Sequence, residues 1–536
     1  MRIPIIDIFA GPGGLGEGFS SLLNADGERI FKIVLSVEME KYAHQTLTLR
    51  SFYRQFKSNE IPEDYYEVLR GNLSVDELFK RYKKESEAAK AEAWKSKLGY
   101  DKESEKPDEV DRRIENALHG VKDWVLIGGP PCQAYSVVGR SRKQNNILNP
   151  KDDERVDLYK QYLRILAIHN PAVFIMENVK GLLSAQIKES PIFSLILRDL
   201  SEPVRAFVSG NGKKIKNLDC PGYRIFSLVV EPRHFDGNGN PIFNHSDYII
   251  KCENYGVPQS RHRVILLGIR KDIEVNPGTL YKNEPIPISK VLIGVPRLRS
   301  GISQMKDSDK NWIKILTDLS QKSFLKISDK QVYNRIKKVT KKLKLPRNKS
   351  GNEFVPYSRI TIKYNCTWYL DDRIGGICNH VSRSHIKDDI YRYMFVSCFG
   401  KEYNKSPILY EFPKQLLPKH ANVDEAINTN KFADRFRVQL WDEPAKTITS
   451  HISKDGHYYI HPDPTQCRSL TVREAARIQT FPDNYYFCGP RTSQYIQVGN
   501  AVPPFLAKQI AEIVYKIIAT IQSNKKLNMS HNHLSI

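Results

Sequence analysis

Short runs of branched and aromatic apolar residues alternate with helical patterns through the first half of the chain. These runs cover residues 3–9, 33–37, 124–127, 172–176, 223–230 and 263–269. Continuous runs of this length, rich in β-branched side chains, are typical of strands buried on both faces of a parallel sheet. Helical patterns such as 157–167 and 192–200 lie between them. The alternation predicts an α/β fold with a doubly wound, Rossmann-like sheet.

Two stretches depart from this alternation. Residues from about 76 to 116 are rich in Lys, Glu and Ala with few large apolar groups, which predicts a charged helical insertion exposed to solvent. Residues 276–466 are rich in Pro, Asn and Lys and predict a smaller domain of mixed, loop-rich structure. Residues 467–536, with a long helix from Pro503 to Ile521, are expected to return to the domain formed by residues 1–275.

The chain carries a large surplus of positive charge. Its 82 Lys and Arg residues outnumber its 60 Asp and Glu residues, which gives a net charge of +22. A field of this sign attracts polyanions, nucleic acid above all. A solubilising surface would have the same composition, so charge indicates a class of partner and no reaction.

The sequence also indicates where the protein works. No apolar run approaches the roughly 20 residues that a membrane span needs, and the N-terminus has no signal-peptide pattern. The eight cysteines are scattered, without a C-x-x-C pair or a Cys/His cluster at metal spacing. We therefore expect a cytoplasmic protein with free thiols, no membrane partner and no metal site.

A glycine-rich loop follows the first predicted strand. Residues 11–16 read Gly-Pro-Gly-Gly-Leu-Gly, and Glu38 ends the second strand about twenty residues later. Glycines there allow a tight turn and close approach of a ligand, and an acid at that distance suits a ribose hydroxyl. The pair favours a nucleotide-like ligand, NAD among them, over a purely structural turn with a surface glutamate.

Three further elements place reactive side chains beside predicted strands. Cys132 lies in Gly-Gly-Pro-Pro-Cys-Gln directly after the third strand, where two prolines stiffen the loop. Glu177 ends the fourth strand, so both side chains would share the crevice at the carboxyl ends of the sheet. Arg261 and Arg263 alternate onto one face before a later strand. A single cysteine is more often a buried apolar residue than a nucleophile, so position alone leaves both interpretations open.

The ordered set of motifs resembles the cytosine-C5 DNA methyltransferases of bacterial restriction-modification type. The motifs are residues 7–14, 130–133, 177–179, 259–263, 473–474 with 481–482, and 497–502. The resemblance covers about the first 270 residues and the last 70, and leaves the Lys-rich middle without a counterpart.

The resemblance implies S-adenosylmethionine as the cofactor. The residues that it assigns to the cofactor pocket are Phe9, Gly11, Gly13, Gly14, Leu15, Glu38, Met39, Asn72, Leu158 with Tyr159, Asn500 and Val502. In this assignment Glu38 bonds the ribose hydroxyls, Met39 lies against the adenine, and Asn72 accepts from the adenine amine.

The resemblance also implies covalent catalysis on a flipped cytosine. Cys132 would attack C6 of the base, and a protonated Glu177 would stabilise the charge that develops at N3. Arg261 would hold the base or its phosphate, with Arg263 in support. The residues 276–466 would recognise a specific sequence in double-stranded DNA, with 322–349 and 379–383 as candidate contacts. We expect a monomer, associated with the nucleoid and paired in function with a restriction endonuclease.

Three alternatives stay open at this point. One is an RNA cytosine methyltransferase acting on tRNA with the same scaffold. Another is a nicotinamide oxidoreductase, suggested by the glycine loop and Glu38 alone. The third is a catalytically silent DNA-binding relative, which predicts degraded motifs.

Overall fold

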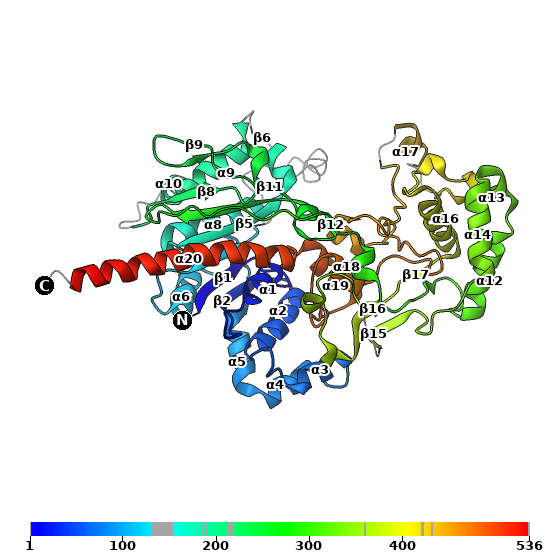
Figure 1. Ribbon diagram of the computed structural model, residues 1–536, viewed down its shortest axis with the longest axis horizontal. Helices are drawn as coiled ribbons and strands as arrows, with labels where there is room; N and C mark the ends of the chain where they lie inside the picture. The colour runs from blue at the N-terminus through cyan, green and yellow to red at the C-terminus, as the bar shows by residue number, and fades with distance from the viewer. Residues whose placement is uncertain are drawn as a thin grey trace.

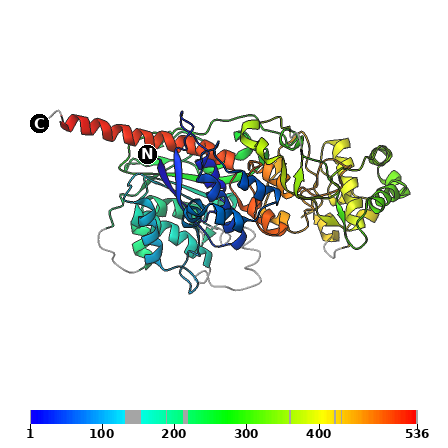
Figure 2. The ribbon, with the colours of Figure 1, turned by 90° about the horizontal axis from the view of Figure 1, so that it is seen from below.

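The structure is a computed structural model of the chain. It describes residues 2–130, 154–184, 186–187, 190–211, 218–357, 361–419, 423–429 and 432–533. Two lobes lie at opposite ends of the molecule in both views (Figures 1 and 2). We call them the sheet lobe, built on the large sheet, and the second lobe, built on α12–α14, α16 and α17 (Figure 1).

One eight-stranded sheet organises the sheet lobe, in the order β11-β13-β5-β4-β1-β2-β3 with β8 also paired to β13. The strands are β1 (Ile3–Ile8), β2 (Phe31–Glu38), β3 (Ala93–Lys95), β4 (Val125–Gly128), β5 (Val173–Val179), β8 (Tyr223–Phe226), β11 (Ile249–Lys251) and β13 (His262–Arg270). The strands β3, β2, β1, β4 and β5 are parallel, and β13 runs antiparallel to β5. All six strands predicted from the sequence are present, and the α/β class is confirmed.

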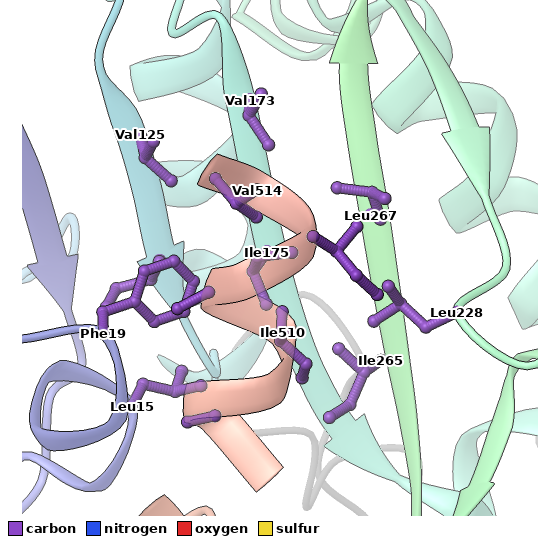
Figure 3. Close-up of a cluster of buried hydrophobic side chains, with 14 of the residues drawn as sticks. Leu15, Phe19, Val125, Val173, Ile175, Leu228, Ile265, Leu267, Ile510 and Val514 are labelled. Atoms are coloured by element: carbon purple, nitrogen blue, oxygen red, sulfur yellow. The ribbon is translucent and has the colours of Figure 1, made fainter. Parts of the chain in front are cut away.

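Helices cover both faces of this sheet. On one face α1 (Gly14–Ser20) packs against α20 (Pro504–His533), and their apolar side chains form one core with the strands. Figure 3 shows Leu15, Phe19, Ile510 and Val514 filling the space over the strands. The other face is covered by α6 (Pro107–Leu118), α8 (Glu154–His169) and α9 (Ile192–Ser201). Each fully buried Leu, Ile or Phe contributes about 1.5–3 kcal/mol, so the two cores fix the positions of the strand ends.

The long terminal helix begins where the sequence predicted and continues further. It runs past Ile521 to His533, and its C-terminal part projects beyond the sheet lobe (Figures 1 and 2). None of the helices within the described ranges is long and apolar enough to cross a membrane.

The charged stretch at 76–116 includes a buried strand that the prediction of a solvated helical insertion did not contain. It does contain helices, namely α4 (Val75–Arg81), α5 (Lys83–Glu92) and most of α6. Between them β3 joins the sheet beside β2, with Ala93 opposite Ser36 and Lys95 opposite Glu38. Trp94 is buried in the core. A three-residue strand between charged helices has no periodicity that could reveal it in a sequence.

The second lobe is more helical than its composition predicts. Its helices are α12 (Asp309–Ser320), α13 (Ser323–Ser328), α14 (Lys330–Lys341), α16 (Lys387–Tyr403) and α17 (Val423–Thr429), and its small sheets pair β14 (Gly301–Ile302) with β17 (Ser384–His385) and β15 (Gly351–Pro356) with β16 (Gly376–Val381). The helix α16 is buried through most of its length and packs against α12 and α14. The lobe therefore has its own apolar core, which includes Trp312, Ile315 and Phe395.

The chain crosses between the lobes more than once. The helices α18 (Val472–Ile478) and α19 (Arg491–Asn500) share a core with residues near 288–292 and 445–452. From the described part of the predicted return segment, α20 and Val502 before it pack in the core on the large sheet. The exact domain boundaries stay a prediction, but this packing places the last motifs between the two lobes.

Candidate active site

The glycine loop lies against the last motif of the chain. Gly13 has φ of 95°, a left-handed conformation that favours glycine. A Cβ on Gly14 would lie 2.3 Å from the carbonyl oxygen of Val502. The hydroxyl of Tyr485 donates to the carbonyl of Pro12. Segments almost five hundred residues apart in sequence are thus brought together at the carboxyl end of β1.

Glu38 is fixed beside this loop. One carboxylate oxygen accepts from the backbone N–H of Gly11 at 2.7 Å, and the other accepts from the N–H of Glu40 at 2.7 Å. Burial raises the pKa of Glu38, whereas these two backbone donors lower it. A carboxylate held by two N–H groups keeps further acceptor capacity for hydroxyl donors of a ligand.

The other candidate cofactor residues differ in their surroundings. Phe9 and Leu158 are half-buried, whereas Met39 and Asn500 are exposed. Leu15 and Val502 are buried, because their side chains are 6% and 7% exposed and belong to the apolar core with α20. Figure 3 shows Leu15 packed there, and its contact with the cofactor stays a prediction.

Asn72 lies between two helices and donates to a neighbouring glutamate. It follows α3 (Glu63–Arg70) in the turn before α4, and its amide donates to Glu67 at 2.7 Å. The strand next to β2 is β3, and Lys95 at its end pairs with Glu38. The segment that follows β3 from Ser96 therefore starts beside Glu38. The N–H of Ser96 donates to the carbonyl of Glu38 at 3.2 Å. A tryptophan, Trp94, amid charged residues was the available signal for this strand.

A second group of polar side chains lies at the ends of β5 and β13. The Nε of Arg263 lies 2.9 Å from a carboxylate oxygen of Glu177, and both side chains are 13% exposed. A Cβ on Gly129 would lie 3.1 Å from the other carboxylate oxygen of Glu177. The amide of Asn178 donates to the carbonyl of Pro130 at 3.4 Å. The loop that leads to residue 132 therefore begins directly against Glu177, while Cys132 itself lies outside the described residues.

Arg261 binds the protein's own backbone, and its predicted contact with the base or its phosphate stays a prediction. Its guanidinium is 1% exposed and donates to the carbonyls of Ile448 at 2.7 Å and Ala501 at 3.0 Å. It also donates to the carbonyl of Gly499. Burial lowers the pKa of Arg261 to about 9. Its two terminal nitrogens hold the backbone of Ile448 and of the last motif, whereas Arg263 contacts the candidate catalytic acid.

Two residues near the glycine loop were not predicted from the sequence. Asp7 is fully buried on β1, neither of its oxygens has a hydrogen-bond partner among the described residues, and burial raises its pKa to about 8. Thr46 donates to Gln497 at 2.6 Å and links α2 (Lys41–Arg54) to the last motif. A carboxyl inside an apolar strand was a visible signal for Asp7, whereas no local pattern marks Thr46.

Comparison with known proteins identifies the class. The family model for C-5 cytosine-specific DNA methylase matches residues 82–202 and 234–516. The chain belongs to this family and is a DNA (cytosine-5-)-methyltransferase. The family predicted from the motifs is thereby confirmed.

Individual relatives span nearly the whole chain. The type II methyltransferase M.Bpa9945I of Bacillus paralicheniformis is 32% identical, over 96% of this chain and 99% of that protein. The DNA (cytosine-5-)-methyltransferase M.ApeKI of Aeropyrum pernix is 26% identical, over 75% of this chain and 83% of that protein. Among solved structures, the methyltransferase EhMeth of Entamoeba histolytica is similar with a TM-score of 0.41 and 12% identity, covering 96% of this chain and 98% of that one.

Proposed function

We propose that the enzyme methylates C5 of a cytosine flipped from double-stranded DNA, through a covalent adduct between Cys132 and C6. The observation that carries this proposal is the meeting of Glu177, Arg263 and Gly129 at the carboxyl ends of β4 and β5 and the start of β13. Open α/β sheets bind ligands at that edge. The glycine loop and Glu38 lie at the end of the adjacent strands β1 and β2.

The residues around the glycine loop fit S-adenosylmethionine. A Cβ on Gly13 or Gly14 would clash with the protein's own Tyr485 or Val502, so these glycines let the loop pack against the last motif. A Cβ on Gly11 would meet no atom within 4 Å, so the loop has open space for a ligand beside Glu38. In the proposed site Glu38 accepts from the ribose hydroxyls. The residues expected around the rest of the molecule are Phe9, Met39, Leu158, Asn500 and Val502, and the segment after β3 takes the place predicted for Asn72. When bound, the cofactor supplies an electrophilic methyl group and leaves as the thioether.

The protein's own groups would carry the remaining chemistry. The thiolate of Cys132 adds to C6, and the electron pair of the C5–C6 double bond becomes available at C5. Glu177 hydrogen-bonds the N3 edge of the base, and Arg263 holds Glu177 in place from 2.9 Å. After C5 is methylated, a base removes its proton, the double bond re-forms, and the thiolate of Cys132 is released. A flipped base is required because C6 is inaccessible to a thiol within a stacked duplex.

We propose that the second lobe binds DNA. Residues 322–349 hold nine Lys and two Arg against a single Asp329, and Lys337 and Lys338 are exposed on α14. The helix α14 lies at the end of the molecule farthest from the sheet (Figures 1 and 2). Contacts there suit phosphates outside the flipped site better than base recognition.

The relatives' names support a type II restriction-modification role for this chain, with a specific DNA sequence and a paired endonuclease. We propose a monomer in the cytoplasm. Because the chain belongs to the methyltransferase family, the nicotinamide oxidoreductase suggested by the glycine loop alone is excluded.

Transfer to tRNA on the same scaffold is the remaining alternative. Assays of methyl transfer to duplex DNA and to tRNA under the same conditions distinguish the two. Activity confined to tRNA would overturn the DNA proposal.

One experiment tests site, activity and mechanism together. Bisulfite sequencing of DNA from cells that express the enzyme should reveal a recurring methylated sequence. Duplexes that carry 5-fluorocytosine at that position should trap a covalent complex, because fluorine cannot leave as the proton does. The Cys132→Ser variant should form no adduct and transfer no methyl, whereas Cys366→Ser, a change at an exposed cysteine, should behave as wild type. Turnover by Cys132→Ser would refute the covalent route.

A further inference from the structure

A cavity of about 450 Å³ lies between α1, α2, the start of α20 and the segment 365–373. Figure 1 shows α1 beside α20. None of the candidate catalytic or cofactor residues is among its described lining. Five cationic side chains and two carboxylates line it, a surplus of three positive charges; they are Arg29, Arg50, Arg54, Arg373, Lys508, Glu17 and Asp371.

The two carboxylates already have partners inside the protein. Glu17 accepts from Arg50 at 2.5 and 2.9 Å, and both side chains are buried. Asp371 accepts from the hydroxyl of Tyr66 at 2.8 Å and from the amide of Asn484 at 2.8 Å. Glu17 is paired with Arg50 and Asp371 is already counted, so the surplus of three positive charges in the cavity remains.

Three of the cations lack full compensation among the described residues. Arg29 makes no ion pair there; its guanidinium donates to the carbonyl of Phe56 at 3.4 Å, and burial lowers its pKa. Lys508 makes no ion pair in the same ranges, and its ammonium lies 5.7 Å from the ring centre of Trp368. Arg54 pairs with Glu92, but its Nε and Nη1 are buried without a partner in that part of the chain.

Partly buried cations without a counterion cost free energy, which a bound anion recovers. We propose that this cavity binds a phosphate group, held by Arg29 and Lys508 with the field of Arg54 behind them. Guanidinium and ammonium donors suit phosphate oxygens, and the neighbouring Trp368 and Tyr53 offer apolar surface to the rest of a nucleotide-sized molecule. The phosphate belongs either to a free compound or to a DNA backbone. The proposal does not depend on the methylation mechanism.

Calorimetry on the full chain, without DNA or cofactor and at constant ionic strength, tests the site with inorganic phosphate as the probe. Saturable binding at one site is expected. The double variant Arg29→Gln with Lys508→Gln should weaken it at least tenfold. Lys516→Gln, an exposed position on the same helix, should leave it within twofold, and Lys508→Arg should retain it. Absence of saturable binding to wild type, or equal affinity in the double variant, would overturn the proposal.

A competition experiment then identifies the source of the phosphate. Displacement of the bound phosphate by a duplex without the methylation sequence supports a DNA backbone. Phosphate that stays bound in the presence of duplex supports a free compound, and adenosine monophosphate should then bind more tightly than inorganic phosphate. The double variant should unfold at the same temperature as the wild type. Weaker phosphate binding then reflects loss of the site and not loss of the fold.

Discussion

The buried arginines of the sheet lobe and the exposed lysines of the second lobe use positive charge in opposite ways. In the sheet lobe, Arg50, Arg54 and Arg261 are buried, and their guanidinium groups bind carboxylates or backbone carbonyls. In the second lobe, the basic residues of 322–349 are mostly Lys, and Lys337 and Lys338 lie on the exposed face of α14. A planar guanidinium can satisfy several fixed acceptors at once, whereas an ammonium is a strongly hydrated point charge.

This difference predicts that removing a charge affects stability in one case and attraction to DNA in the other. Removing a buried arginine leaves acceptors without donors and lowers the free energy of unfolding. Removing an exposed lysine leaves the fold intact and weakens only a long-range, salt-dependent attraction. Four sets of variants test that division, beginning with the partly buried acid that we propose for catalysis.

Glu177→Gln should give the largest effect. The variant keeps the shape of the side chain but loses the charge that Arg263 contacts and the acid proposed for the N3 edge of the base. We expect kcat to fall about 10²–10⁴-fold, with cofactor affinity nearly unchanged. Steady-state kinetics and cofactor titration measure both. Glu253→Gln, a partly buried acid paired with His262, is the matched control, and a similar loss there would remove the special role of Glu177.

Arg261→Met should mainly destabilise the protein. The carbonyls of Ile448, Gly499 and Ala501 would lose their donor, at about 1–3 kcal/mol for each buried group left unsatisfied. Urea unfolding should show a decrease of about 3 kcal/mol or more in the free energy of unfolding. Arg263→Met should lose less stability and more of kcat. A stable but inactive Arg261→Met would support the substrate-binding role predicted for that residue from the resemblance.

Asp7 should make stability depend on pH in an unusual direction. Burial raises its pKa from the ordinary 3.8 to about 8, so the folded protein holds this proton more tightly than the unfolded chain. The stabilisation is complete below pH 3.8 and is lost as pH rises through about 8. Relative to Asp7→Asn, wild type should lose up to about 1.4 kcal/mol per pH unit in that window. If the free energies of unfolding in urea changed with pH in the same way for both proteins between about pH 5 and 8, this prediction would be wrong.

Exposed lysines should give the smallest effect. The triple change replaces Lys337, Lys338 and Lys342 with Gln. It should make the plot of log affinity for DNA against log salt concentration less steep, by at most about 0.9 for each phosphate that is no longer neutralised. Stability and kcat at saturating DNA should not change. The matched control neutralises Lys83, Lys84 and Lys90, three exposed lysines on α5. An equal decrease of slope in the control would show that net charge alone, and not the second lobe, attracts DNA.

Much of the sheet lobe could be predicted from local patterns. Six strands were located because apolar runs buried on both faces are continuous, and the glycine loop and Glu38 meet because they end adjacent strands. The strand β3 escaped detection because three residues carry no period. The side chain of Leu15 packs in the core, which no local pattern distinguishes from a position facing a ligand.

The motifs themselves determined the family and the candidate reactive groups, because their chemistry and order are written along the chain. Tertiary structure decided which arginine faces the acid and which holds the backbone, since Arg261 and Arg263 are two residues apart and locally equivalent. It also decided that cations from α2, α20 and the loop at Arg29 line one cavity. Contacts of that kind depend on how distant segments pack, and no local pattern in a sequence encodes them.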